Sequence, residues 1–288
     1  MKLVTFHTRA RHSIGKVVGQ QVIDLPASDP SLPGSMLEFL QGGQLFMERA
    51  RVLEPSQAVT YPLADVSLDA PVPNPSKFLA IGMNYRKHVA EAVAAGIKVP
   101  DSQVWFNKQV SCVNGPFDSV LMPKVSDHLD YEAELGVVIG TRCRHVSEAD
   151  AASVIAGYVV CNDVSVRDWQ MRSPTMMLGK SFNTHGPFGP WIVTREEIAD
   201  PHNLSMRMFV NGELRQEVNT GEMIYNIWQQ IAYLSTVMTL EPGDVLATGT
   251  PSGVGLAYKP PKFLKVGDVA RVEIDGVGHI ENRVAQEI

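Results

Sequence analysis

The sequence predicts an α+β fold in which strands outnumber helices. Short apolar runs of strand length, separated by Gly, Pro and Asn-Gly turn signals, fill most of the chain. Few segments space their apolar residues as a helix does. The 288 residues suffice for one large domain, or for a small domain plus a larger one. We therefore expect a curled antiparallel or mixed sheet with few helices.

The N-terminal segment is expected to form a small α/β unit. MKLVTF alternates as a strand does, and SIGKVVGQQVIDL is typical of a hairpin that turns at Gly19-Gln20. Ser35 is placed to cap a helix through MLEFLQGGQLFMERARVLE, which Gly42-Gly43 can interrupt. The prolines of DAPVPNPS are then spaced as in a stiff linker. We place a domain boundary near residue 72, which divides the chain into residues 1–72 and 73–288.

Four segments of the second domain have interpretable patterns. Ser147 begins SEADAASVIAG, which we interpret as a short capped helix. GYVVCND is typical of a buried strand, and Asn211-Gly212 is a strong hairpin signal. MIYNIWQQIAYL has apolar residues at helical spacing, which predicts a helix with one face in the core.

Composition excludes several classes of protein. The net charge of −6 argues against a general nucleic-acid binder. Cys112, Cys143 and Cys161 have no metal-binding spacing and cannot all pair, so we expect reduced, packed cysteines in a cytoplasmic protein. The N-terminus lacks the apolar region of a signal peptide, and the apolar runs are too short to span a bilayer.

The run LDYEAELGVVIG (129–140) resembles a buried strand but carries Glu132 and Glu134. Residues two apart in a strand point to the same face, so these carboxylates lie side by side and repel. A proton, an Arg or Lys, or a divalent cation could offset the repulsion; alternatively, the pair faces water. Asp163, which ends the apolar run VVCND, can bring a third carboxylate to the same rim. Three such acids suit Mg²⁺, Mn²⁺ or Ca²⁺.

A second candidate site lies in KFLAIGMNYRKHVAEA (77–92). His88 and Glu91 are three residues apart, so they can touch on one helical turn. A carboxylate fixes the imidazole tautomer and raises its basicity, which lets the pair take a proton from water. The plainer alternative is a solvated ion pair of little consequence.

Two further segments carry candidate residues. Lys180 lies among small and apolar residues and could stabilise an oxyanion, although a surface position is the plainer alternative. LATGTPSGVG (246–255) is rich in Gly, Thr and Ser but lacks the GxxxxGK[ST] pattern, so we reject a nucleotide phosphate loop. A tight turn that presents backbone N–H groups and the Thr250 hydroxyl to a carboxylate fits better.

Six segments in order resemble the fumarylacetoacetate hydrolase (FAH) superfamily, and they cover most of residues 76–270. They are KFLAIGMNYRKHVAE, DYEAELGVVIG, GYVVCNDVSVRDWQ, GKSFNTHGPFGP, NGELRQ and LEPGDVLATGTPSGVG. The chain resembles the bacterial members that carry a short N-terminal domain. The resemblance implies a mixed β-sandwich or roll in the catalytic domain, and a homodimer.

The resemblance also implies roles for the matching residues. The implied metal ligands are Glu132, Glu134 and Asp163; the implied catalytic residues are His88 and Glu91, on a lid that orders with substrate, and Lys180; the implied substrate contacts are Tyr85, Arg86, Arg167, Gln170, Thr184 and Thr250. Residues 92–108 and 171–177 vary widely between relatives and would choose the substrate. Met83 stands where some relatives have Arg, which leaves a charge contact there in doubt.

Members of the superfamily act on small 2-oxo and 2,4-dioxo acids. We expect a Mg²⁺- or Mn²⁺-dependent hydrolase that cleaves a C–C bond of an acylpyruvate or fumarylpyruvate through a pyruvate enolate, with His88 and Glu91 activating water. Lys180 and Arg167 would accept the anionic substrate.

Two alternatives remain open. The same enolate chemistry serves a decarboxylase or an isomerase of a 2-oxo acid, of the oxaloacetate or 2-hydroxyhepta-2,4-diene-1,7-dioate type. A non-catalytic binding protein would lack a metal carboxylate or the lysine, and neither is missing here. Neither nucleic acid nor a membrane is expected as a partner.

Overall fold

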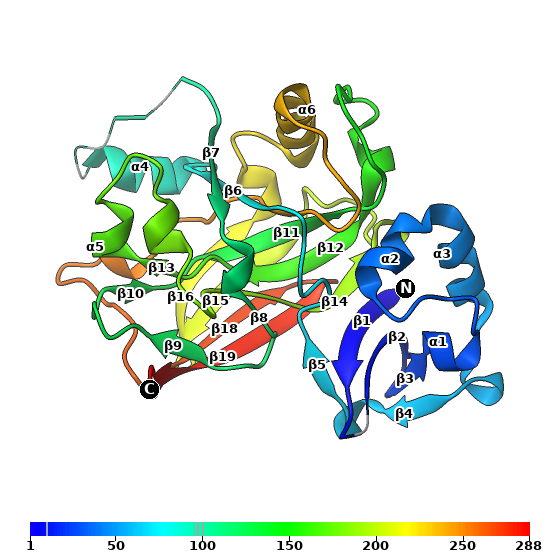
Figure 1. The fold of residues 1–288 in the computed structure, drawn as a ribbon. Helices are drawn as coiled ribbons and strands as arrows, with labels where there is room; N and C mark the ends of the chain where they lie inside the picture. The colour runs from blue at the N-terminus through cyan, green and yellow to red at the C-terminus, as the bar shows by residue number, and fades with distance from the viewer. Residues whose placement is uncertain (10, 95, 97, 100) are drawn as a thin grey trace.

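The computed structural model describes residues 1–9, 11–94, 96, 98–99 and 101–288. Strands dominate, and the chain has the α+β fold that the sequence predicts. Figure 1 shows the N-terminal elements, in blue, on one side of a larger body that ends with the red C-terminal strands.

The N-terminal elements follow the expected order. They are β1 (Lys2–His7), β2 (His12–Val18), β3 (Gln21–Asp24), α1 (Leu25–Ser28), α2 (Met36–Gln41), α3 (Gly43–Val52), β4 (Thr60–Pro62) and β5 (Ser67–Asp69), with 3₁₀ turns at Pro55–Gln57 and Leu63–Asp65. The β2–β3 hairpin turns at Gly19, which has a φ of 59°. The Ser35 side chain accepts a hydrogen bond from the N–H of Glu38, and the positive φ of Gly43 separates α2 from α3. These local predictions are confirmed.

The main sheet runs through both parts of the chain. Its further strands are β6 (Phe78–Gly82), β7 (Val104–Lys108), β8 (Val113–Asn114), β11 (Ala133–Ile139), β12 (Ile155–Asn162), β14 (Gly186–Thr194) and β17 (Val245–Ala247). In the described residues the order is β4-β3-β2-β1-β14-β12-β11-β17-β6-β7, with β5 on β1 and β8 on β14. Strand β1 pairs antiparallel with β14 through Leu3 and Ile192 (Figure 1). The boundary near residue 72 stays a prediction, because the first strands extend the sheet of the following part.

A second sheet packs against the first. It has the order β16 (Glu213–Asn219), β15 (Ser205–Val210), β18 (Val269–Ile274), β19 (Gly278–Gln286) and β9 (Val120–Met122), while β10 (Leu129–Asp130) pairs with β13 (Ser165–Val166). Leu135 and Val137 of β11 share one apolar core with Met208 and Val272 of the second sheet. Every residue of β11 and β12 is buried, so polar groups at their ends are also held away from bulk water.

Among its described residues, the second part has the α-helices α4 (Arg86–Ala94), α5 (Arg167–Gln170) and α6 (Ile227–Val237). Helix α6 begins with a capping box between Asn226 and Gln229, as the helical pattern predicts. No helix in the described ranges combines the length and apolar character needed to cross a membrane. All three cysteines are free and buried, as expected.

One local prediction is corrected and one is confirmed. Ser147 accepts a hydrogen bond from the N–H of Asp150, but it caps only a turn that leads to a 3₁₀ segment at Ala151–Val154. Strand β12 begins at the next residue, which leaves no room for an α-helix. Asn211 and Gly212 both have positive φ and form the predicted turn between β15 and β16. Further 3₁₀ turns occur at Val110–Cys112, Met177–Lys180, Arg195–Glu197, Thr220–Glu222 and Gly255–Ala257.

Candidate active site

Three carboxylates converge where β11 and β12 meet. The antiparallel register pairs Ala133 with Asn162, so Glu132 faces Asp163 across the ladder, and the N–H of Asp163 donates to the Glu132 carbonyl at 2.9 Å. Glu134 is the second residue of β11. One oxygen from each of the three carboxylates lies within 4.8 Å of the others, and all three residues are buried. The alternative of two water-facing glutamates is therefore wrong.

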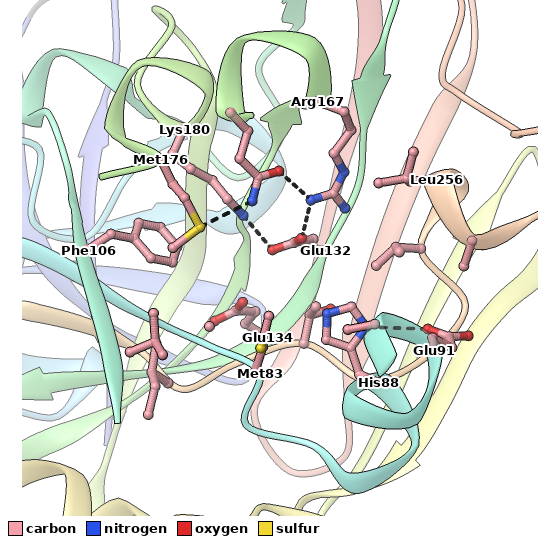
Figure 2. Close-up of a pocket in the computed structure, with 18 of the residues that line it drawn as sticks. Met83, His88, Glu91, Phe106, Glu132, Glu134, Arg167, Met176, Lys180 and Leu256 are labelled. Carbon is pink, nitrogen blue, oxygen red and sulfur yellow. Dashed lines mark hydrogen bonds and ion pairs between the residues drawn. The ribbon is translucent and has the colours of Figure 1, made fainter. Parts of the chain in front are cut away.

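Buried cations surround this acid cluster of Glu132, Glu134 and Asp163. The Nζ of Lys180 lies 2.6 Å from Glu132 Oε2 and 2.7 Å from Asp163 Oδ2. Figure 2 shows Lys180 and Arg167 converging on Glu132, which Arg167 Nη1 contacts at 2.7 Å. The Nζ of Lys108 lies 2.7 Å from Asp163 Oδ1 and also donates to the carbonyl of Lys180.

Asp130 completes the ion-pair network. Its Oδ2 accepts from Arg167 Nε at 2.7 Å, and its two oxygens also accept from the backbone N–H groups of Gly255 and Leu256. These bonds tie Arg167 to the loop that follows Thr250. The arginine is thus held rigidly, while its Nη2 has no hydrogen-bond partner among the described residues.

The carboxylates of the cluster differ in their protonation. Burial opposes ionisation of Glu132, but Lys180 and Arg167 outweigh it and lower its pKa to about 2. Burial raises the pKa of Glu134 well above its ordinary value, and the charges of Asp163 and Glu132 raise it further. Within the described residues Glu134 pairs with no Lys or Arg, and its Oε2 accepts from the N–H of Gly249 at 2.7 Å.

A divalent cation fits this cluster on the chemistry of its donors. Four carboxylates (Asp130, Glu132, Glu134 and Asp163) face three basic side chains (Lys108, Arg167 and Lys180), so one negative charge is left uncompensated. That charge falls on Glu134, which holds a proton unless a cation replaces it. Hard carboxylate oxygens at this spacing suit a hard divalent ion, and the site as a whole would then carry about one positive charge.

His88 and Glu91 occupy another side of the cavity. Both belong to α4, and His88 Nδ1 lies 3.3 Å from Glu91 Oε2. Glu91 Oε1 also accepts from the N–H of Gly253 at 3.1 Å, which anchors the helix to the 246–255 loop. Figure 2 shows the imidazole of His88 directed toward the acid cluster while Glu91 lies behind it. With Nδ1–H donating to Glu91, Nε2 is the free basic nitrogen.

The cavity between these groups has a volume of about 180 Å³. Its polar end contains Glu132 and Glu134 of the acid cluster, with Arg167, Lys180 and His88. Much of the remaining wall is apolar and is formed by Met83, Val104, Phe106, Met171, Met176, Val254 and Leu256. Drug-sized ligand pockets have volumes of about 300–1,000 Å³, so this cavity suits a compact substrate of few atoms.

The other predicted site residues divide into two groups. Gln170 and Thr250 line the cavity, where Gln170 Oε1 accepts from Arg167 at 2.9 Å. Tyr85, Arg86 and Thr184 are not among the residues that line it. Tyr85 is buried in the core, Arg86 is exposed, and the Thr184 hydroxyl accepts from the N–H of Leu121 at 2.9 Å. Of the expected substrate-selecting stretch 92–108, residues 95, 97 and 100 lie outside the described residues.

Two buried charges at the site were missed from the sequence. Lys108 was assigned only to the substrate-selecting stretch 92–108, and Asp130 was treated as part of a motif without a role. Charge counting could have indicated a further cation such as Lys108, because three buried carboxylates with one lysine and one arginine are not neutralised. Asp130 also stands two residues before Glu132 at the start of the same run, a position that brings it near the cluster.

The family follows from comparison with known proteins. The family described as "Fumarylacetoacetate (FAA) hydrolase C-terminal" matches residues 77–285, a range that contains every residue of the cluster. The chain belongs to the fumarylacetoacetate hydrolase family.

Relatives within the FAH family have several activities. A protein from Xenopus laevis named oxaloacetate tautomerase fahd2, mitochondrial, is 46% identical over 92% of this chain and 83% of its own. A fumarylacetoacetate hydrolase from Exiguobacterium antarcticum has a similar structure, with a TM-score of 0.87, 35% identity and full coverage of both chains. A maleylpyruvate hydrolase from Sphingobium sp. SYK-6, solved with manganese(II) and pyruvate, has a TM-score of 0.81, 33% identity and full coverage of both chains.

Proposed function

We propose that this protein is an isomerase that interconverts the keto and enol forms of a compact 2-oxo dicarboxylic acid of the oxaloacetate type. The observation that carries the proposal is the placement of the basic Nε2 of His88 across a small cavity from Lys180 and Arg167. This arrangement can hold an anion while one proton moves. The name of the Xenopus laevis relative supports the same class of reaction, so the isomerase alternative replaces hydrolysis as our first choice.

The charges of the site suit an anionic substrate. The unpartnered Nη2 of Arg167 and the ammonium of Lys180 are buried at the polar end, where low dielectric strengthens their attraction for a carboxylate. The amide of Gln170 and the hydroxyl of Thr250 line the same cavity and can orient the remaining oxygens. A Mg²⁺ or Mn²⁺ ion held by Glu132, Glu134 and Asp163 would stabilise the negative charge that develops on the 2-oxo oxygen.

His88 then moves the proton. In the keto-to-enol direction its Nε2 takes a proton from carbon 3, and the electrons of that C–H bond form the carbon 2–carbon 3 double bond. Glu91 stabilises the resulting imidazolium through the Nδ1–H bond. Return of the proton to the 2-oxo oxygen, directly or through water, gives the enol, so no atom is gained or lost. The apolar wall keeps bulk water away from this carbanion-like state.

Hydrolysis of an acylpyruvate is the second candidate, and the His88–Glu91 pair favours it. The same base can take a proton from water, whose oxygen attacks carbon 4; the carbon 3–carbon 4 bond then breaks to give pyruvate and a carboxylic acid. The maleylpyruvate hydrolase with 33% identity supports this reading. The two reactions differ in the substrate, since hydrolysis needs a carbonyl at carbon 4, and in whether a water molecule fits beside it.

A substrate panel tests the choice. Oxaloacetate, acetylpyruvate and fumarylpyruvate would be incubated with the protein and Mg²⁺, while the ultraviolet absorbance of the enol and the formation of pyruvate are followed separately. We expect accelerated loss of oxaloacetate enol without pyruvate. Pyruvate from oxaloacetate would indicate decarboxylation instead, and pyruvate from the acylpyruvates would indicate hydrolysis. Activity that survives thorough chelation would contradict the metal role.

Four further properties of the protein are also proposed: its metal ion, its assembly, its partners and its location. We propose Mg²⁺ as the natural ion, a homodimer as the assembly, a small 2-oxo acid as the only class of partner besides the second copy, and the cytoplasm as the location. Metal replacement assays and measurement of mass in solution test the first two.

A further inference from the structure

We propose that His7, His12 and Asp69 form a second metal site, for a transition-metal ion of the Zn²⁺ type. One ligand atom from each of the three side chains lies within 4.8 Å of the others. They belong to β1, β2 and β5, and none of them lines the catalytic cavity. The site is therefore separate from the acid cluster and differs from it in donor chemistry.

The strands place the three residues on one face. His7 lies directly opposite His12 in the β1–β2 ladder, and Asp69 lies opposite Thr5 in the β1–β5 ladder. Residues two apart in a strand share a face, so Thr5, His7 and their cross-strand partners point the same way. The two imidazole rings are 5.0 Å apart between centroids. Because β1 is hydrogen-bonded to β2 on one side and to β5 on the other, the backbone positions of all three ligand residues are fixed.

The carboxylate of Asp69 bridges the two rings. Its Oδ1 lies 3.0 Å from Nδ1 of His7, and its Oδ2 lies 3.5 Å from Nδ1 of His12. In the part of the chain that the structure describes, no Lys or Arg forms an ion pair with Asp69. The nearby Arg11 pairs with Asp24 instead, at 3.5 Å. The carboxylate is only one-quarter exposed. A cation held together with the two imidazoles would neutralise it.

The donor set selects the metal. Two imidazole nitrogens and one carboxylate oxygen are the three protein ligands of a well-known class of Zn²⁺ site, in which water takes the fourth position and the protein ligands bind at about 2.0–2.2 Å. Tetrahedral angles then require ligand atoms about 3.4 Å apart, so the side chains must close in slightly. His12 is 79% exposed and His7 is 38% exposed, which leaves both free to rotate. Mg²⁺, which prefers all-oxygen ligands, would be a poor occupant.

The remaining coordination position is accessible. His12 and Asp69 also line a surface cavity of about 420 Å³, whose other walls include residues 34–37, 73–74, 113–115 and 118. Water or a small anion can enter there as the fourth ligand. Bound metal would join the turn end of the β1–β2 hairpin to β5, the strand that precedes the proline-spaced segment. Because the unfolded chain does not hold these three groups together, the ion stabilises the folded state by mass action.

Zn²⁺ stoichiometry tests the proposal without any catalytic readout. Wild type, His12→Asn, His145→Asn and Glu134→Gln would be dialysed against Zn²⁺ and analysed for metal and protein. His145 is a matched control, because it is also exposed, and Asn tolerates its positive φ. We expect His12→Asn to hold one Zn²⁺ fewer than wild type, His145→Asn to equal wild type, and Glu134→Gln to keep the ion at His12. Equal stoichiometry in wild type and His12→Asn would overturn the site.

A second measurement protects against misfolding as an explanation. Co²⁺ bound to imidazole in a tetrahedral site absorbs visible light, whereas Co²⁺ at an all-oxygen octahedral cluster absorbs only weakly. We expect the intense bands in wild type and Glu134→Gln but not in His12→Asn, whose Mg²⁺-dependent isomerase activity stays at the wild-type level. Intense bands that persist in His12→Asn would refute the assignment, whatever the outcome of the substrate panel.

Discussion

The ammonium of Lys108 lies 2.7 Å from the carboxylate of Asp163, and both side chains are completely buried. Burial opposes the charge of this lysine, yet Asp163 raises its pKa above the ordinary value, so the pair stays ionised. Strand β7 delivers Lys108 to the acid cluster from a distance of more than fifty residues along the chain. The pair has direct consequences for stability and for metal binding.

Replacing Lys108 by Met should destabilise the protein by about 3–5 kcal/mol, because it removes one of the two buried cations beside Asp163 and leaves only Lys180, which Glu132 shares. Urea unfolding measures this change. Lys262→Met is the matched control: this lysine is 43% exposed and pairs with Glu213 at 3.0 Å, so we expect a change of no more than about 1 kcal/mol. Equal losses in the two variants would show that the buried pair is not special.

The metal-free protein should lose stability as pH rises, through Glu134. Its pKa is higher in the folded state than the ordinary value of 4.5, so the folded chain binds more protons than the unfolded one above that pH. A divalent cation replaces that proton, and metal affinity should therefore increase with pH. Differential scanning fluorimetry with and without Mg²⁺ should show a Tm difference that grows from acid to neutral pH. Glu134→Gln should abolish the growth, and a pH-independent difference in wild type would argue against this assignment.

His88→Gln should reduce isomerisation by roughly 10²- to 10⁴-fold, the usual contribution of a general base. Gln removes the basic nitrogen but keeps a side chain of similar length on α4. Mg²⁺ affinity, measured by calorimetry, should change little, because His88 is not a predicted ligand. Glu91→Gln should lower the rate less, since it removes the negative charge that stabilises the His88 imidazolium but leaves the base in place. A variant at His88 that retains the full rate would exclude it from proton transfer.

His185 should make the fold sensitive to acid. Burial lowers the pKa of His185 to about 4; its Nε2–H donates to the carbonyl of Leu121 at 2.8 Å, and its Nδ1 has no partner among the described residues. The unfolded chain takes up a proton below pH 6.5 and the folded chain does not, so stability should fall between pH 6.5 and about 4. The loss corresponds to about 3 kcal/mol at 1.36 kcal/mol per unit.

Denaturant unfolding of His185→Gln across this pH range checks that prediction. The variant should show a shallower pH dependence than wild type, while exposed His145→Asn should retain the wild-type slope. Parallel pH profiles for wild type and His185→Gln would contradict the role of this histidine.

Sequence reasoning found those parts of the site that local periodicity and strand ends determine. The two-residue spacing places Glu132 and Glu134 together, and the end of an apolar run delivers Asp163. The three-residue spacing of His88 and Glu91 likewise predicts their contact. Each of these features depends on a few neighbouring residues, which is why a single sequence suffices to indicate them.

The parts that were missed depend on long-range pairing. Lys108 reaches Asp163 only because β7 lies beside β6 at the edge of the main sheet, and no local pattern encodes that neighbour. The burial of Tyr85 and the bond between Thr184 and Leu121 also arise from tertiary packing. Motif resemblance placed these residues at the correct segments but could not say which way their side chains point.

Because β1 pairs with β14, the first part of the chain extends the main sheet and also shields the edge of β14 from solvent. Leu3 shares an apolar cluster with Ile192, and both are completely shielded from solvent. In a shortened protein that begins at residue 73, the edge of β14 that pairs with β1 would have unpaired backbone groups. The apolar side chains beside that edge would be exposed to solvent. Exposed strand edges pair with strands of other molecules. We therefore expect the shortened protein to aggregate, although it retains every residue of the candidate active site.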